Sequence, residues 1–123
     1  MRALVLHDGS VLIHAPSYAV HVEHTTRSVN VFALDAGTQA VGARTQALTF
    51  DEVEGVEVAL GDLRGTPIRL RRALGGALEL GIWQLEAEAR HVARSLAAVL
   101  YRPITWVDVK DEEPTGKIDP DSG

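Results

Sequence analysis

Residues 50–60 read FDEVEGVEVAL, and this stretch is the most informative part of the chain for its fold. Val56, Val58 and Leu60 recur at every second position, which is the pattern of a strand with one buried face. Val53 lies three residues before Val56 and therefore falls out of phase with that face. Because Gly55 sits inside the slip, a β-bulge there would restore the buried face. The stretch therefore predicts a sheet strand that carries a bulge near its start.

Short apolar stretches separated by turn residues precede this strand. Asp8-Gly9 predicts a two-residue hairpin turn, which would set Leu4 opposite Ile13. Residues 35–37, Asp-Ala-Gly, predict a three-residue turn with Gly37 in the left-handed conformation. The strands expected after the first hairpin turn are residues 18–24, 29–34, 39–43 and 46–50.

Two further strands are expected after residue 60, joined by a turn at residues 73–76. Ile68 and Leu70 form the inward row of the first, and Leu78, Leu80 and Ile82 form that of the second. Pairing Leu70 with Leu80 places Arg71 opposite Glu79, a charge pair that supports this register. In that register Trp83 points away from the inward row, where a partner or the end of the chain could cover it.

The hydrophobic period then changes from that of a strand to that of a helix. Glu86 precedes Arg90 by four residues, a spacing that favours an ion pair on the helix surface. Pro103 disfavours a helical conformation for the residue before it, so the helix is expected over about residues 85–101. The apolar stripe consists of Leu85, Ala89, Val92, Leu96, Val99 and Leu100.

Length and composition restrict the class of protein. The chain has 123 residues, no cysteine and a net charge of −5. That length suits one domain, and the lack of cysteine excludes disulfides and thiolate metal sites. The negative charge argues against a protein that coats nucleic acid, and no apolar run is long enough to cross a bilayer. The first residues lack the long apolar core of a secretory signal, so a cytoplasmic protein is expected.

The negative charge is concentrated at the C-terminal end. Residues 1–107 hold ten Arg against eleven Asp and Glu, whereas residues 108–123 hold six acids against two lysines. We therefore expect one β-rich domain over residues 1–107 and an acidic disordered tail over residues 108–123. The alternative is that a short strand follows Trp106, since Val107 and Val109 alternate.

The expected order, a run of antiparallel strands closed by one amphipathic helix, resembles the pleckstrin-homology-like domains of small bacterial proteins. Residues 50–56, FDEVEGV, are similar to a strand entry in such domains, and residues 86–96, EAEARHVARSL, are similar to their closing helix. The resemblance implies a curved or partly closed sheet and an interaction scaffold rather than a catalyst. The lipid-binding members carry basic residues in the first strand connection. Here that turn is His7-Asp8-Gly9-Ser10, so phosphoinositide binding is not implied.

Few residues have the spacing of a catalytic, metal or cofactor site. The only close cluster of possible metal ligands is His21-Val22-Glu23-His24, in which a strand would point His24 away from His21 and Glu23. The serines lack a nucleophile-elbow sequence, and the glycines form no phosphate-binding loop. We therefore expect no enzymatic activity, no cofactor and no metal. An enzyme with a site built from His21, Glu23 and a distant strand is the third of three hypotheses, after the two given next.

The strongest hypothesis is a protein-interaction or self-association module, expected as a homodimer. An open sheet leaves edge strands that can pair with another chain, and residues 18–24 and 39–43 are the expected edges because neither contains lysine or an internal proline. The alternative is a binder of a small anionic ligand or lipid headgroup. The candidate contact residues are Arg64, Arg69, Arg71, Arg72 and Trp83.

Overall fold

A computed structural model of the chain describes residues 1–108, which form two sheets and one α-helix. The N-terminal sheet has the order β1-β2-β3-β4-β5 and is antiparallel throughout. Its strands are β1 (Arg2–Val5), β2 (Val11–His14), β3 (Tyr18–Glu23), β4 (Ser28–Leu34) and β5 (Val41–Thr49). The C-terminal sheet has the order β8-β7-β6-β9. It consists of β6 (Val53–Leu60), β7 (Thr66–Arg72), β8 (Ala77–Trp83) and β9 (Ile104–Asp108).

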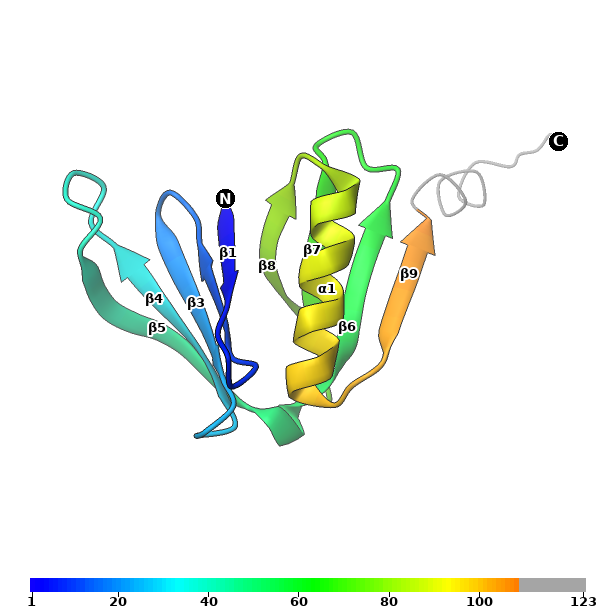
Figure 1. Cartoon of the computed structure of the whole chain (residues 1–123), viewed down its shortest axis with the longest axis horizontal. Coiled ribbons are helices and arrows are strands. Elements are labelled where there is room, and N and C mark those ends of the chain that lie inside the picture. The colour runs from blue at the N-terminus through cyan, green and yellow to red at the C-terminus, as the bar shows by residue number, and fades with distance from the viewer. Residues whose placement is uncertain (109–123) are drawn as a thin grey trace, which may run out of the picture.

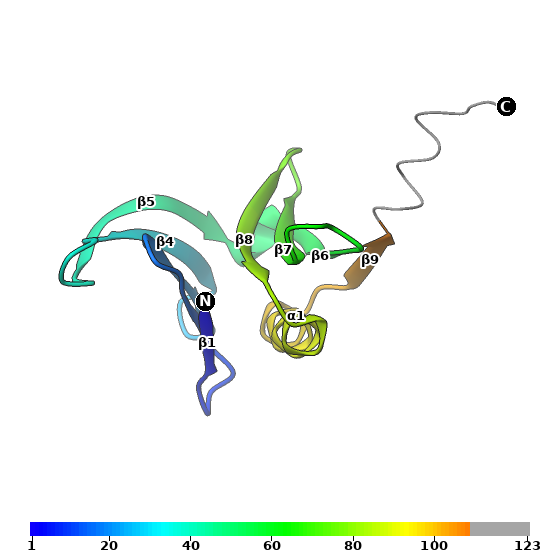
Figure 2. The ribbon, with the colours of Figure 1, turned by 90° about the horizontal axis from the view of Figure 1, so that it is seen from above.

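The two sheets stand side by side, and helix α1 (Glu86–Leu100) lies against the C-terminal sheet on the side seen in Figure 1. Seen from above, the N-terminal sheet is curved and the helix occupies one side of the C-terminal sheet (Figure 2). Side chains from both sheets and the helix join in one apolar core, so the described residues form one folded unit. The prediction of a mainly β chain with antiparallel strands and one helix is confirmed. The strands form two sheets rather than the single curved sheet or partly closed barrel that was predicted, and neither sheet closes.

The bulge predicted at Gly55 is confirmed. Val53 pairs with Arg72 and Gly55 pairs with Arg71, so one extra residue lies between them on β6. Val56 and Val58 are fully buried beyond it. A Cβ atom at position 55 would lie 3.2 Å from the Pro103 carbonyl oxygen, so glycine also allows the close approach of the segment after the helix.

The register predicted for the first hairpin is wrong by one residue. Leu4 pairs with Leu12, not with Ile13, because the loop contains three residues, His7, Asp8 and Gly9. Gly9 takes the left-handed conformation with φ 93°. The Asp8 carboxylate accepts a 2.9 Å hydrogen bond from the Ser10 N–H, which holds the pKa of Asp8 below its ordinary value. A one-residue slip exchanges the two faces of a strand, and therefore Leu4 lies on the face opposite to the core.

The turn after β4 also differs from the prediction. The Asp35 carboxylate accepts hydrogen bonds from the N–H groups of Gly37 and Thr38, and Gln39 rather than Gly37 is left-handed, with φ 62°. The two strands expected over residues 39–43 and 46–50 are one strand, β5, with register shifts along its pairing with β4. Residues 50–52 form the short helix η1 (Phe50–Glu52) instead of ending that strand.

A second bulge, which the sequence analysis missed, changes the register of β8. Leu70 pairs with Leu78, and the extra residue is Leu80 because Arg69 pairs with Glu79 while Ile68 pairs with Gly81. The shift turns Trp83 inward, so the predicted outward position is wrong and the side chain is 1% exposed within the core. The Arg71–Glu79 pair is also wrong: Glu79 lies 3.6 Å from the Arg69 guanidinium.

The helix agrees closely with its predicted bounds. It covers Glu86–Leu100, and Tyr101 ends it in a left-handed conformation. The predicted stripe is buried except for Leu85, which precedes the helix and is exposed. The Arg90–Glu86 ion pair is present at 2.8 Å. This helix is also too short to span a membrane, and residues 1–108 hold no other α-helix.

Strand β9 follows the helix and extends one residue into the segment predicted as a disordered tail. It runs parallel to β6, which the crossover through β7, β8 and α1 makes possible. The open alternative of a strand after Trp106 is thus correct in kind, although the strand starts earlier, at Ile104. The rest of the predicted tail, residues 109–123, lies outside the described residues.

Candidate functional site

Three of the four arginines predicted to contact an anion or partner already face carboxylates of their own chain. Arg69 lies 3.0 Å from Glu57, and Arg71 lies 3.4 Å from Glu54. Arg64 donates two side-chain hydrogen bonds to Asp62, which lower the pKa of that carboxyl and raise the pKa of the guanidinium. The positive charge of this segment is therefore largely balanced within the C-terminal sheet.

The other two predicted contact residues, Arg72 and Trp83, do not form a shared surface. Arg72 is exposed and carries no side-chain hydrogen bond or ion pair among residues 1–108. Trp83 is buried, and Met1 lies over neighbouring Gly81 so closely that a Cβ atom there would be 2.6 Å from the methionine Cε. The tryptophan contributes to the core and offers no surface to a partner.

The histidine cluster spreads over a strand and the turn after it. The His21 ring packs against the Phe32 ring at a tilt of 54°, with centroids 5.0 Å apart, whereas His24 follows the end of β3. Within residues 1–108, no group of three or more His, Asp or Glu side chains is placed to hold a metal ion. The possible enzyme residues His21 and Glu23 sit on the same strand face, at the surface of the N-terminal sheet.

That surface, which we call the outer face, is the side of the N-terminal sheet opposite to the core. Val11, Ile13, Val20 and Val22 point into the core, so the residues that alternate with them point outward. The strand registers align two cross-strand rows on the outer face. One row is Leu4, Leu12, His21, Asn30 and Ala47, and the other is Arg2, His14, Ala19, Phe32 and Arg44.

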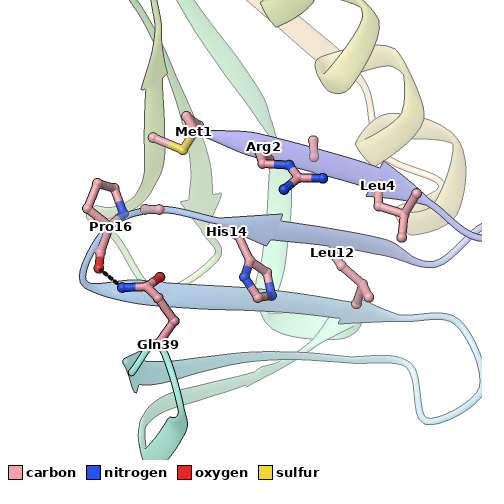
Figure 3. A pocket seen from close by; sticks show the side chains of 9 residues that line it. Met1, Arg2, Leu4, Leu12, His14, Pro16 and Gln39 are labelled. Atoms are coloured by element: carbon pink, nitrogen blue, oxygen red, sulfur yellow. Dashed lines mark hydrogen bonds between the residues drawn. The ribbon is translucent and has the colours of Figure 1, made fainter. Parts of the chain in front are cut away.

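Two of the hollows formed by residues 1–108 open on this face. The larger, which we call the β1–β2 hollow, measures about 610 Å³ and is shown in Figure 3. Its lining residues are Met1, Arg2, Ala3, Leu4, Leu12, His14, Ala15, Pro16 and Gln39. Arg2 and His14 are cross-strand partners, and Figure 3 shows their side chains on the same side of the sheet as Leu4 and Leu12. The lining contains no carboxylate.

The smaller hollow, about 370 Å³, lies toward β5, and several of its lining side chains hydrogen-bond to one another. Arg44 donates a 3.2 Å hydrogen bond to the Asn30 side chain, which in turn donates one of 3.1 Å to the Ser28 hydroxyl. Glu23 and Glu52 also line it. The polar groups of this hollow already hydrogen-bond to one another, and its lining carries both positive and negative side chains. It therefore has fewer unpaired groups for an external ligand than the larger hollow.

Strand β1 combines an open sheet edge with exposed apolar side chains. It pairs with β2 alone, and all four of its residues are exposed. Leu4 is 58% exposed and Val5 43%, so two neighbouring apolar side chains of this strand are in contact with water. Figure 2 shows β1 at the margin of the curved sheet, at the opposite end from β5.

The edges formed by β5 and β8 are less suited to pairing with another chain. β5 is an edge, as expected for residues 39–43, but register shifts interrupt it. The expected edge over residues 18–24 is wrong, since β3 lies between β2 and β4. The β8 edge is partly occupied, because the Tyr18 hydroxyl donates to the Leu80 carbonyl and Met1 covers Gly81.

Sequence reasoning missed both the β1 edge and the β1–β2 hollow. The one-residue error in the first hairpin placed Leu4 on the face of Ile13, which is fully buried. The clue in the sequence was that Gly9 suits a three-residue loop as well as a two-residue turn. Comparisons with known proteins add no family to this geometry: no protein-family model matches the chain, and no curated protein matches it.

Proposed function

We propose that the protein is a non-enzymatic self-association module, built on a pleckstrin-homology-like scaffold, that pairs with a second copy along β1. The observation that carries this proposal is the uninterrupted, apolar and exposed edge of that strand. Natural sheets protect such edges with very short strands, charged side chains, proline, bulges or a covering element. β1 is short, with four residues, and Arg2 is its only charged residue, but it has no lysine, proline or register shift.

The hydrogen-bond pattern of the first hairpin indicates which backbone groups are available. The Leu6 N–H donates to the Ser10 carbonyl, so Leu6 directs its polar groups toward β2. In an antiparallel pair every second residue hydrogen-bonds to the partner strand, and therefore Leu4 and Arg2 also direct their N–H and C=O groups toward β2. Ala3 and Val5 direct their N–H and C=O groups away from β2, where a new strand can accept and donate.

These groups favour one register for two copies related by a twofold axis. If Ala3 pairs with Val5 of the second copy, and Val5 with its Ala3, four backbone hydrogen bonds form around the axis. Leu4 then faces its own counterpart at the centre, with Cα atoms about 4.5–5.5 Å apart as for directly opposed residues. Arg2 lies opposite Leu6, so the register brings no like charges together.

A disulfide test of this register is sharp because the natural chain has no cysteine. In the Leu4→Cys variant the single thiol would face its counterpart within the Cα range of about 4.4–6.8 Å that a disulfide requires. We expect rapid formation of a covalent dimer with a stoichiometric oxidant, read on a non-reducing gel.

Two matched controls distinguish register from random collision. In Leu6→Cys the thiols would lie four strand positions apart, roughly 13 Å, which is too far to bridge. Leu63→Cys places the thiol on a fully exposed loop residue of the other sheet. Equal cross-linking of all three variants would contradict the proposed pairing, and so would the absence of cross-linking at position 4. If Leu4→Cys does not cross-link, the β1 edge would have to pair with a different protein rather than with a second copy of this chain.

A further inference from the structure

We propose that the β1–β2 hollow binds a small amphipathic anion, with a carboxylate or phosphate head and a short apolar body. This ligand site goes beyond self-association, and it differs from the Arg64–Arg72 segment in its charge balance. Arg64, Arg69 and Arg71 of that segment lie within 3.4 Å of carboxylates, and Arg72 alone in it has no ion pair among residues 1–108. Arg2 has no ion pair among these residues either, but it shares its hollow with His14.

The polar side of the hollow favours an oxyanion. Arg2 and His14 face one another across the β1–β2 ladder, and no acidic side chain lines the hollow with them. A guanidinium offers paired N–H donors that match the two oxygens of a carboxylate or the oxygens of a phosphate. The imidazole adds a further hydrogen-bonding group beside it. Both side chains project from strands, which fix their positions better than a loop does.

The remaining walls of the hollow favour an apolar body. Leu4, Leu12 and Pro16 line it, and its volume of about 610 Å³ falls within the range of small-molecule sites, about 300–1,000 Å³. Leu4 is 58% exposed, so an apolar ligand against it would remove surface that the chain itself leaves in water.

One end of the hollow is held in place by a strained residue. Gln39 adopts a left-handed conformation although it is not glycine, and its side-chain amide donates a 3.1 Å hydrogen bond to the Pro16 carbonyl (Figure 3). Such a conformation persists only where the surrounding contacts hold it. The loop after β4 is thereby tied to the β2–β3 turn, and this contact bounds the hollow at the end farthest from Leu4.

The test is an NMR titration of the full chain with sodium octanoate, octyl phosphate, octanol and acetate. We expect saturable shifts of the backbone amides around residues 2–4, 12–16 and 39 with the two octyl anions, and none with acetate. Octanol should bind at least about tenfold more weakly, because it lacks the charge-assisted hydrogen bonds. The stronger of the two anions identifies the head group.

Two variants complete the test. Arg2→Gln should weaken octanoate binding about tenfold, whereas Arg44→Gln, on the same face but outside this hollow, should leave it unchanged. The titration is repeated on the Val5→Lys variant, whose substituted side chain lies on the opposite face, so that binding is measured apart from self-association. Equal binding of octanol, unsaturable shifts, or an equal effect of both arginine variants would overturn the proposal.

Discussion

At the scale of single residues, Tyr18 links the two sheets. Its hydroxyl donates a 2.8 Å hydrogen bond to the carbonyl of Leu80, the extra residue of the β8 bulge. A bulged residue lacks a full set of ladder partners, and the tyrosine from β3 supplies one. Burial, together with the charge of Glu79, raises the pKa of Tyr18. The folded state is therefore more stable when the Tyr18 phenol is protonated than when it is ionised.

Replacing Tyr18 with phenylalanine should lower the free energy of unfolding by about 1 kcal/mol at neutral pH, because the Leu80 carbonyl loses its donor. Since the folded state holds the phenol proton more tightly than the unfolded state, this stabilisation is present below the ordinary pKa of 10.0 and is lost as the pH rises above it. Urea unfolding at a series of alkaline pH values should show the two proteins converging.

Tyr101→Phe is the matched control for the titration, since Tyr101 is 79% exposed. Its stability should follow that of the natural protein across the same pH range. A constant difference between Tyr18→Phe and the natural protein at all pH values would contradict the assigned role of the hydroxyl.

Arg102 shows a residue contact that the sequence could not reveal. Its guanidinium donates to the carbonyls of Val53 and Phe50, 2.7 and 3.1 Å away, and also to those of Leu100 and Tyr101 at the helix end. A cation at a helix C-terminus is favourable for local reasons. The Val53 and Phe50 carbonyls lie about 50 positions earlier in the chain, so their contact with Arg102 depends on the tertiary fold and cannot be predicted from a local sequence pattern.

At the scale of elements, the helix stripe is the best test of how the core is held. Leu96 is fully buried among side chains of the core, whereas Arg94 is exposed two positions earlier. Leu96→Asp should abolish cooperative unfolding, since an unpaired buried carboxylate costs several kcal/mol out of the roughly 5–15 kcal/mol of a typical domain. Arg94→Asp should change stability by no more than about 0.5 kcal/mol. Thermal melts followed by circular dichroism compare the two, and equal damage would contradict the assigned stripe.

Elements with a strong period were predictable, and those set by a single extra residue were not. The helix and the Gly55 bulge follow from spacing alone, since a wrong phase would have placed Val53 or Leu96 in water. The bulge at Leu80 was hidden because Leu78, Leu80 and Ile82 alternate well without it. The bulge buries the Trp83 side chain, and the free energy gained by that burial outweighs the simpler pairing without a bulge.

At the scale of the whole molecule, the position of β1 makes the proposed function possible. The sequence predicted that an open sheet would leave edges, but the order of five strands decides which ones. A meander places its first and last strands outermost, so residues 18–24 became central and residues 2–5 became the edge. The candidate surface therefore depends on the topology and on a one-residue hairpin register, neither of which composition or charge could specify.

Self-association through β1 is the central claim, and sedimentation velocity over a range of protein concentrations tests it most directly. The natural protein should be a dimer at micromolar concentration. Val5→Lys should be a folded monomer, since a charge on the edge strand opposes pairing. Leu63→Lys, which alters a fully exposed loop residue, should remain a dimer. A natural protein that stays monomeric at a hundred micromolar, or a Val5→Lys variant that still dimerises, would contradict the claim.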